Sequence, residues 1–139
     1  MQLQSVFTRS GKLAAFALVA LVAFGCESVN LIGPENQLEV GTAADNFQFQ
    51  VSGLDNVTEN LSYDWENTGT QATIDISQSL TQGSAIVTIT DADGTVVHQE
   101  DLRQDNDTDT AVGTAGTWRI DVQFDGSSGT VNFIVQRTT

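Results

Sequence analysis

Lysine, cysteine and histidine are almost absent from this 139-residue chain. Lys12, Cys26 and His98 are its only representatives of the three residue types. A single cysteine excludes an intramolecular disulfide, and His98 has no second histidine or cysteine with which to form a transition-metal set. Positive charge is equally scarce, since 5 Lys and Arg stand against 18 Asp and Glu, for a formal net charge of −13. Such a surface repels phosphate, so we expect no nucleic-acid partner.

The few positive charges are distributed unevenly. Arg9 and Lys12 lie near the start, whereas every acidic residue lies at Glu27 or later. From Cys26 onward, 114 residues carry 3 arginines, 18 acidic residues and no lysine, so the formal net charge of this part is 3 − 18 = −15. This composition is similar to that of proteins from high-salt environments, where charge repulsion is screened within about 3 Å at 1 M salt. The alternative is an acidic surface that gathers cations or a basic partner.

The first 25 residues have the layout of a secretory signal peptide. Two cations precede an uncharged apolar run over residues 13–24, and Gly25 and Cys26 follow it. That run is shorter than the roughly 20 residues that a permanent membrane-spanning helix requires. A basic start, an apolar middle and a small residue at the cleavage point are typical of a signal that is removed after export. We therefore predict a cleaved signal helix over residues 1–25.

The end of this segment, Ala23-Phe24-Gly25-Cys26, resembles the lipobox of bacterial lipoproteins, with Ala23 where leucine is usual. The resemblance implies transfer of a diacylglyceryl group to the Cys26 sulfur, cleavage before Cys26 and acylation of the new amino terminus, commonly with palmitate. Two or three acyl chains, at about 0.8 kcal/mol per buried CH₂, hold a small domain on a membrane. We expect a lipid-anchored protein of the bacterial cell envelope, whether periplasmic or surface-facing.

The rest of the chain divides into a tether and a β-domain. Residues 26–45 include the only proline and show no helical period, so we expect a flexible tether with a short strand around residues 38–40. Residues 46–139 alternate apolar and polar positions persistently, as half-buried antiparallel strands do. The alternating apolar positions are Phe47, Phe49, Val51, Leu61, Tyr63, Trp65, Ala72, Ile74, Ile76, Ala85, Val87, Ile89, Trp118, Ile120, Val122, Phe124, Val131, Phe133 and Val135.

This pattern predicts an all-β fold, an antiparallel β-sandwich of jelly-roll or immunoglobulin-like type with about seven or eight strands. Two hairpins are expected in it. One joins residues 85–90 to 95–99 through a turn that ends at Gly94, and the other joins residues 118–124 to 130–136 through a glycine-containing loop.

The C-terminal half, from "TITDADGTVV" to "GTAGTWRIDVQFDGSSGTVNFIVQ", resembles exported bacterial β-sandwich modules of the prepeptidase C-terminal type. The resemblance covers residues 84–136 and rests on a D-x-D-G hairpin, a Gly-aromatic strand and a final hairpin. It implies a non-catalytic accessory module, although the companion protease of such modules is not in this chain.

Three carboxylates at alternate positions, Asp105, Asp107 and Asp109, have the spacing with which a loop wraps oxygens around a hard cation. Calcium is the expected ion of such a site, and we expect no other cofactor. The twelve-residue EF-hand pattern fails here, because positions 6 and 12 counted from Asp105 are Thr110 and Gly116. A solvated acidic loop that binds no ligand is therefore the favoured interpretation, and a calcium site is the alternative.

No motif in the chain indicates catalysis. His98 lies in an expected edge strand, and no Gly-x-Ser-x-Gly elbow accompanies it. Tyr63, Trp65 and Trp118 share strand parity with apolar residues, which favours core packing over a sugar-binding platform. We therefore expect a non-catalytic binding, scaffolding or envelope-structural module, whose protein or polysaccharide partner the sequence does not identify. The alternative is a small envelope hydrolase or a carbohydrate-binding module that acts on polysaccharide.

Overall fold

The computed structural model describes residues 30–104 and 106–139; the predicted signal peptide and Cys26 lie outside this range. The described chain has the following elements: a 3-10 turn Pro34–Asn36, β1 Glu39–Ala43, β2 Asn46–Asn67, β3 Ala72–Thr90, β4 Val96–Asp101, β5 Asp107–Asp109 and β6 Gly116–Arg137. No helix within the described ranges has the length and apolar character needed to cross a membrane.

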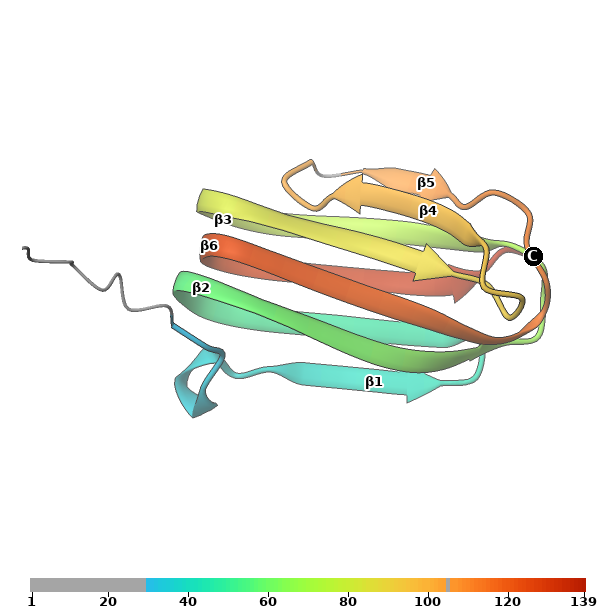
Figure 1. The fold of residues 1–139 in the computed structure, drawn as a ribbon, viewed down its shortest axis with the longest axis horizontal. Coiled ribbons are helices and arrows are strands. Elements are labelled where there is room, and N and C mark those ends of the chain that lie inside the picture. The colour runs from blue at the N-terminus through green and yellow to red at the C-terminus, as the bar shows by residue number, and fades with distance from the viewer. Residues whose placement is uncertain (1–29, 105) are drawn as a thin grey trace, which may run out of the picture.

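The strands form one antiparallel sheet in the order β1-β2-β6-β3-β4, and β5 pairs with the first part of β3. Three of them, β2, β3 and β6, are 22, 19 and 22 residues long, far above the usual strand length. Each bends in its middle and doubles back over itself, so the sheet folds into two packed layers (Figure 1). The predicted antiparallel β-sandwich is therefore confirmed.

Layer 1 contains β1, β5 and the arms 46–51, 72–78 and 131–137 of the long strands. Layer 2 contains β4 and the arms 59–67, 85–90 and 116–124. Between the arms, the ladder shifts register in all three strands. We call the bends at residues 52–58, 79–84 and 125–130 the hinge end. The opposite end, which holds the turns between β1 and β2, β2 and β3, and β3 and β4, together with the C-terminus, is the far end (Figure 1).

The bends depend on backbones that approach one another more closely than side chains allow. Gly83, at φ +74°, faces the carbonyl of Gly126, and Gly129, at φ +125°, faces the carbonyl of Ser79. A Cβ atom at either glycine would overlap that backbone. The register shifts at the bends are of the kind that β-bulges produce.

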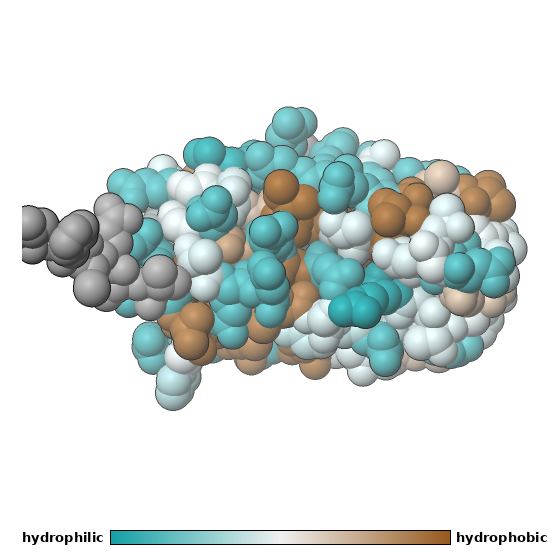
Figure 2. Space-filling model, in the orientation of Figure 1, coloured by the Kyte–Doolittle hydropathy of each residue, from teal (hydrophilic) through white to brown (hydrophobic). Residues whose placement is uncertain are grey.

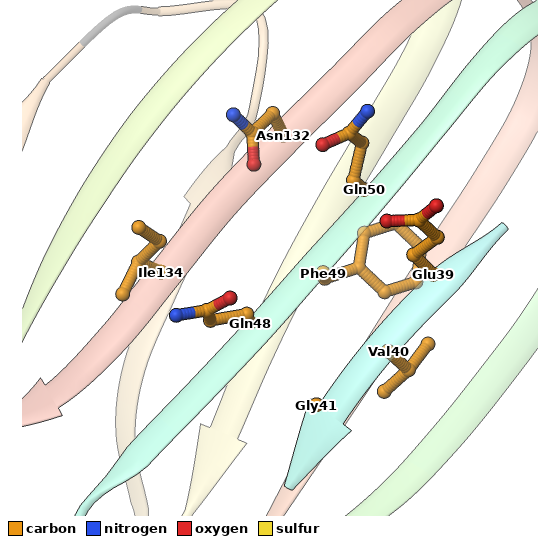
Figure 3. A pocket seen from close by; sticks show the side chains of 8 residues that line it. All are labelled: Glu39, Val40, Gly41, Gln48, Phe49, Gln50, Asn132 and Ile134. Carbon is orange, nitrogen blue, oxygen red and sulfur yellow. The ribbon is translucent and has the colours of Figure 1, made fainter.

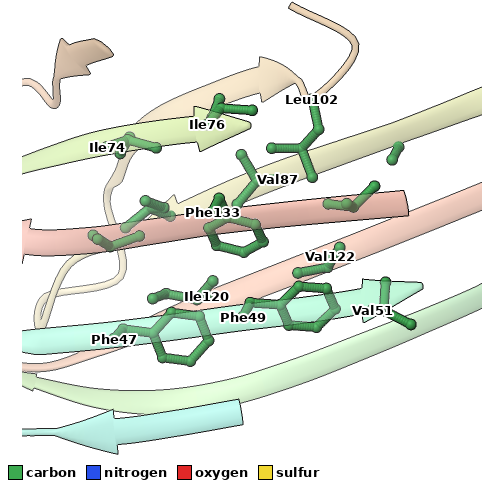
Figure 4. Packing of buried hydrophobic residues seen from close by; sticks show 14 of the residues in the cluster. Phe47, Phe49, Val51, Ile74, Ile76, Val87, Leu102, Ile120, Val122 and Phe133 are labelled. Carbon is green, nitrogen blue, oxygen red and sulfur yellow. The ribbon is translucent and has the colours of Figure 1, made fainter. Parts of the chain in front are cut away.

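The core fills the space between the layers with apolar side chains from every long arm (Figure 4). Phe49 stacks on Phe133 within layer 1, with ring centroids 5.1 Å apart, and meets Phe124 of layer 2 at 6.3 Å. Near the far end Trp65 and Trp118 pack edge to face at 5.9 Å. Aromatic pairs in these geometries stabilise the fold by more than the burial of their surface area alone. The positions predicted as apolar and inward therefore form the core.

One predicted hairpin is confirmed and the other is wrong. Residues 85–90 pair with β4 across a turn closed by the Asp91 N–H, which donates to the Thr95 carbonyl at 2.8 Å. Residues 118–124 and 130–136, in contrast, belong to one strand, β6, and lie in different layers. The glycines between them bend a strand from one layer to the other, so the described residues form six strands where about seven or eight were expected.

Residues 30–43, within the segment expected as a tether, are bonded to β2. β1 pairs with residues 46–50, and the Asn36 side-chain amide donates to the Gly53 carbonyl at 2.8 Å. The Ile32 N–H donates to a carboxylate oxygen of Glu59, also at 2.8 Å. The folded domain thus includes Asn30 and everything described after it.

Replacing Gly129 with alanine tests the bend. We expect Gly129→Ala to lower the free energy of unfolding by about 3 kcal/mol, because alanine is strained at this φ and its Cβ overlaps Ser79. Urea unfolding followed by the fluorescence of Trp65 and Trp118 measures the effect. Gly41→Ala is the control, since a Cβ there makes only an ordinary contact, 3.8 Å from the Gln48 Cβ; its effect should stay within about 0.5 kcal/mol. Equal effects of the two variants would contradict the proposed role of the bend.

Candidate functional site: the outer face of layer 1

The outer face of layer 1 carries a ladder of amide side chains. Strand alternation points Phe47 and Phe49 into the core and Gln48 and Gln50 outward from the same arm. On the neighbouring arm of β6 the outward positions fall opposite them: Gln50 pairs with Asn132. We call the outward group the amide face; its members are Asn46, Gln48, Gln50, Asn132, Ile134 and Gln136.

A shallow depression of about 390 Å³ lies where the amide face meets β1. Gly41 pairs with Gln48 in the register and has no side chain to fill the space beside it. Figure 3 shows the two glutamines, Asn132 and Ile134 on one side of the sheet, with the Glu39 carboxylate at the β1 edge. The lining residues are Glu39, Val40, Gly41, Gln48, Phe49, Gln50, Asn132 and Ile134. The lining thus combines polar groups with two partly exposed aliphatic side chains, those of Val40 and Ile134.

Within the described residues, the side chains of Gln48, Gln50 and Asn132 make no hydrogen bond to the protein. Each amide offers two N–H donors and one carbonyl acceptor, so the face presents a regular array of unused donors and acceptors. Along a strand the outward positions repeat every two residues, about 6.8 Å, and between strands about 4.8 Å. This array can bind a ligand that has many hydroxyl or amide groups.

The corresponding face of layer 2, seen in Figure 2, carries hydrophilic side chains interrupted by several hydrophobic patches. Its centre is bonded internally. The Arg119 Nε donates to the Ser62 hydroxyl and to the Asp121 carboxylate, both at 3.0 Å, and Ser62 also bonds to Asp121. At its edge the Gln99 amide donates to the Thr88 hydroxyl at 3.0 Å. The bonds among Arg119, Ser62 and Asp121 make these three side chains less available to a ligand than the amides of layer 1. Two further outward amides of layer 2, Asn60 and Gln123, pair in the register and make no hydrogen bond within the described residues.

The acidic residues of the predicted calcium loop are only partly placed. Asp105 lies outside the described residues, whereas Asp107 and Asp109 lie in β5, which pairs with β3. Asp109 accepts a hydrogen bond from the Thr73 hydroxyl at 2.7 Å, and Asp107 is opposite Asp75. In the part of the chain that the structure describes, no three His, Cys, Asp or Glu side chains are grouped closely enough to hold a metal ion. The calcium site remains a prediction.

His98 lies in the edge strand β4, where the sequence placed it, but its side chain is only 14% exposed. Its Nε2 is 2.9 Å from a carboxylate oxygen of Glu100, and the other oxygen of Glu100 accepts a hydrogen bond from the Asn106 amide at 2.7 Å. Opposite His98 in the register is the core residue Ile89. These three polar side chains thus cover the side of the core between β4 and the start of β5, a role that the isolated histidine did not indicate.

The three aromatic residues considered for a sugar platform pack into the core. Trp65 and Trp118 are buried, and Tyr63 packs partly buried against Phe47 with ring centroids 5.7 Å apart. The Trp118 indole N–H donates to the Thr114 carbonyl at 2.7 Å. The preference for core packing is therefore confirmed.

Asp91 organises the far end of layer 2. Its carboxylate accepts backbone N–H bonds from Thr95 at 2.8 Å, from Thr114 at 2.9 Å and from Asp93 at 3.0 Å. These donors, with Thr95 foremost, hold the pKa of Asp91 below its usual value, although burial acts in the opposite direction. The residue joins the β3–β4 turn to the loop before β6, a long-range contact with no signal in the sequence.

The candidate site residues that the sequence did not indicate are three amides of layer 1. Gln48, Gln50 and Asn132 occupy outward strand positions, which strand alternation alone could have identified. That signal shows which side chains face outward, but the pairing of β2 with β6 is what brings them together.

No family model matches this chain, and no curated protein sequence matches it either. Among solved structures, it is similar to part of a glycoside hydrolase family 43 arabinoxylan arabinofuranohydrolase from Bacillus subtilis, with 18% identity over 76% of this chain and a TM-score of 0.34. It is also similar to part of an infectious bursal disease virus structure, with 13% identity over 86% of this chain and a TM-score of 0.29. The matched regions are 22% and 36% of those two chains, and similarity this low establishes no relationship.

The bonds to Asp91 predict an acid-sensitive far end. Because its pKa is lowered in the folded state, the ionised carboxylate stabilises the fold above its ordinary pKa, and that stabilisation is lost as the pH falls through the folded value. Asp91→Asn should lower the melting temperature at pH 7 and reduce its decline below about pH 4. Thermal melts between pH 2 and pH 7 measure both effects. Asp125→Asn, which removes an exposed carboxylate, is the control; the same change in this variant would exclude the Asp91 explanation.

Proposed function

We propose that this protein is a lipid-anchored, non-catalytic binding module of the bacterial cell envelope, and that the amide face of layer 1 binds an uncharged polysaccharide. The observation that supports the binding role is the set of outward amides without hydrogen-bond partners in the described protein. The lipobox-like sequence that ends at Cys26 supports the location.

The chemistry of the amide face favours a neutral, hydroxyl-rich ligand. Protein interfaces are enriched in Tyr, Trp, Phe, Met and Arg, and the amide face has none of these. Small apolar ligands prefer enclosed apolar cavities, whereas the depression here is shallow and mostly polar. The excess of acidic residues in the chain opposes binding of anionic polymers. A neutral sugar chain offers hydroxyl groups for the amides and aliphatic C–H surface for Ile134.

The surroundings of His98 favour binding over hydrolysis. Its ring bonds to Glu100, on the side of the core covered by β4, and the amide face lies on the outside of the other layer. A general base must reach the proton that it removes from a bound substrate or water. Among the described residues that line the depression, Glu39 is the one side chain that could act as a general acid or base. Glycoside hydrolysis ordinarily requires a pair of carboxyl groups.

Lipidation is tested on the full chain expressed in a bacterium. We expect the wild-type protein to incorporate labelled fatty acid and to partition with membranes, and Cys26→Ser to do neither, because the thiol is the acyl acceptor. Ser28→Ala is a matched control that leaves the cysteine in place. Membrane partitioning and acyl labelling that persist in Cys26→Ser would refute the anchor.

Binding is tested by retention on insoluble neutral polysaccharides such as cellulose, xylan and mannan. The double variant Gln48→Ala/Asn132→Ala should weaken binding about tenfold, since each lost hydrogen bond contributes about 0.5–1.5 kcal/mol. Gln123→Ala, an exposed amide on the layer 2 arm of β6, should leave retention unchanged. Unaltered binding by the double variant would show that the binding site is not the amide face. Release of soluble sugars during incubation would support the hydrolase alternative.

A further inference from the structure

We infer that the hinge end of the sandwich rests on the lipid headgroups and that the far end points away from the membrane. This orientation rests on the proposed acylation of Cys26. It assigns a membrane-contact surface around Leu31, and it follows from where the described chain begins and from the side chains exposed there.

The start of the described chain is held at the hinge end. The Asn30 side-chain amide donates to the Asp55 carbonyl at 2.8 Å, and the Thr58 N–H donates to the Asn30 carbonyl at 3.1 Å. Asn30 also forms an isolated parallel bridge with Val57. All of these partners belong to the bend of β2, so Asn30 has a fixed place on this end of the domain.

The distance from Asn30 to the proposed anchor is limited by chain length. Four peptide steps separate Cys26 from Asn30, and at 3.8 Å per step they span at most about 15 Å. At about 3.3 Å per residue, the β6 arm over residues 116–124 extends about 25–30 Å from the hinge end. If Cys26 is anchored in the bilayer, the hinge end must therefore lie close to the lipid surface. The segment between Cys26 and Asn30 is too short for the far end to reach the lipid surface unless the domain lies on its side.

The surface around Asn30 has the chemistry of a headgroup contact. Leu31 is 64% exposed and lies beside a depression of about 460 Å³. Glu35 and Asp55 line the same depression, as do Gly53 and Val57. An exposed leucine can enter the interfacial region, and two carboxylates can accept hydrogen bonds from headgroup ammonium groups, so the surface suits zwitterionic phosphatidylethanolamine better than anionic lipid.

This orientation has a consequence for the amide face. The strands of layer 1 run from the hinge end to the far end (Figure 1). In the proposed orientation their outer face is therefore roughly perpendicular to the membrane plane. Gln48 and Asn132 then face sideways, toward polymer that lies above the lipid surface.

Two tryptophan variants of the lipidated full chain test the orientation. Leu31→Trp and Val112→Trp place the same probe at positions with similar exposure, 64% and 71%. Val112 lies at the far end, next to Gly113, whose N–H donates to the Thr70 carbonyl. In phosphatidylethanolamine–phosphatidylcholine vesicles with brominated acyl chains, we expect Leu31→Trp emission to fall at least twofold more than Val112→Trp emission. The buried Trp65 and Trp118 supply the same background in both variants.

Failure of the orientation and failure of the anchor give different results. Mass spectrometry of the purified protein shows whether Cys26 is acylated. Where it is not, coupling the only thiol of the chain to a maleimide-bearing lipid supplies the anchor chemically and the same quenching comparison applies. Equal quenching of the two probes, or stronger quenching at Val112→Trp, in either anchored protein overturns the orientation.

Discussion

The close approach of strand backbones at the hinge end is the constraint on which the rest of the molecule depends. Gly83 faces the Gly126 carbonyl and Gly129 faces that of Ser79, at distances that exclude a side chain. Three long strands can therefore pass from one layer to the other without leaving the sheet. Each strand supplies apolar residues to both sides of the same core, and that shared burial holds the two layers together.

This architecture separates the functions proposed for different parts of the surface. The hinge end holds the bends of the long strands, the residues that follow β4 and the bonded residues 30–36. Because Asn30 is bonded there, this end is the one nearest an anchor at Cys26. The far end contains the turns fixed by Asp91, and its bonds stabilise loops rather than bind a ligand. On the outer face of layer 2 the central Arg119, Ser62 and Asp121 bond to one another, whereas Gln48, Gln50 and Asn132 on layer 1 make no hydrogen bond within the described residues. A ligand-binding role is thus best supported for layer 1.

The errors made from sequence have physical causes. Alternation with period 2 continues through a bend, so residues 118–124 and 130–136 read as two strands of a hairpin although β6 is continuous. Gly126 and Gly129 have the positive φ expected of a turn, but here they bend a strand between layers. The segment before residue 46 reads as a tether because its bonds, such as that of Asn36 to Gly53, join distant residues. His98 appeared isolated because its partner Glu100 has no motif to mark it.

The sequence by itself determined the strand character and the inward-facing residues, because period-2 patterning is a local property. The predicted signal peptide likewise follows from a local feature, a short apolar run after two cations. Only the tertiary structure decided which arms share a layer, that residues 30–43 belong to the folded domain and which outward amides become neighbours. Those features depend on pairing between strands that are separated in the sequence, by more than 80 positions for Gln50 and Asn132, and on backbone contacts at glycines. No local pattern encodes such pairings, so the candidate binding face became visible only in the folded molecule.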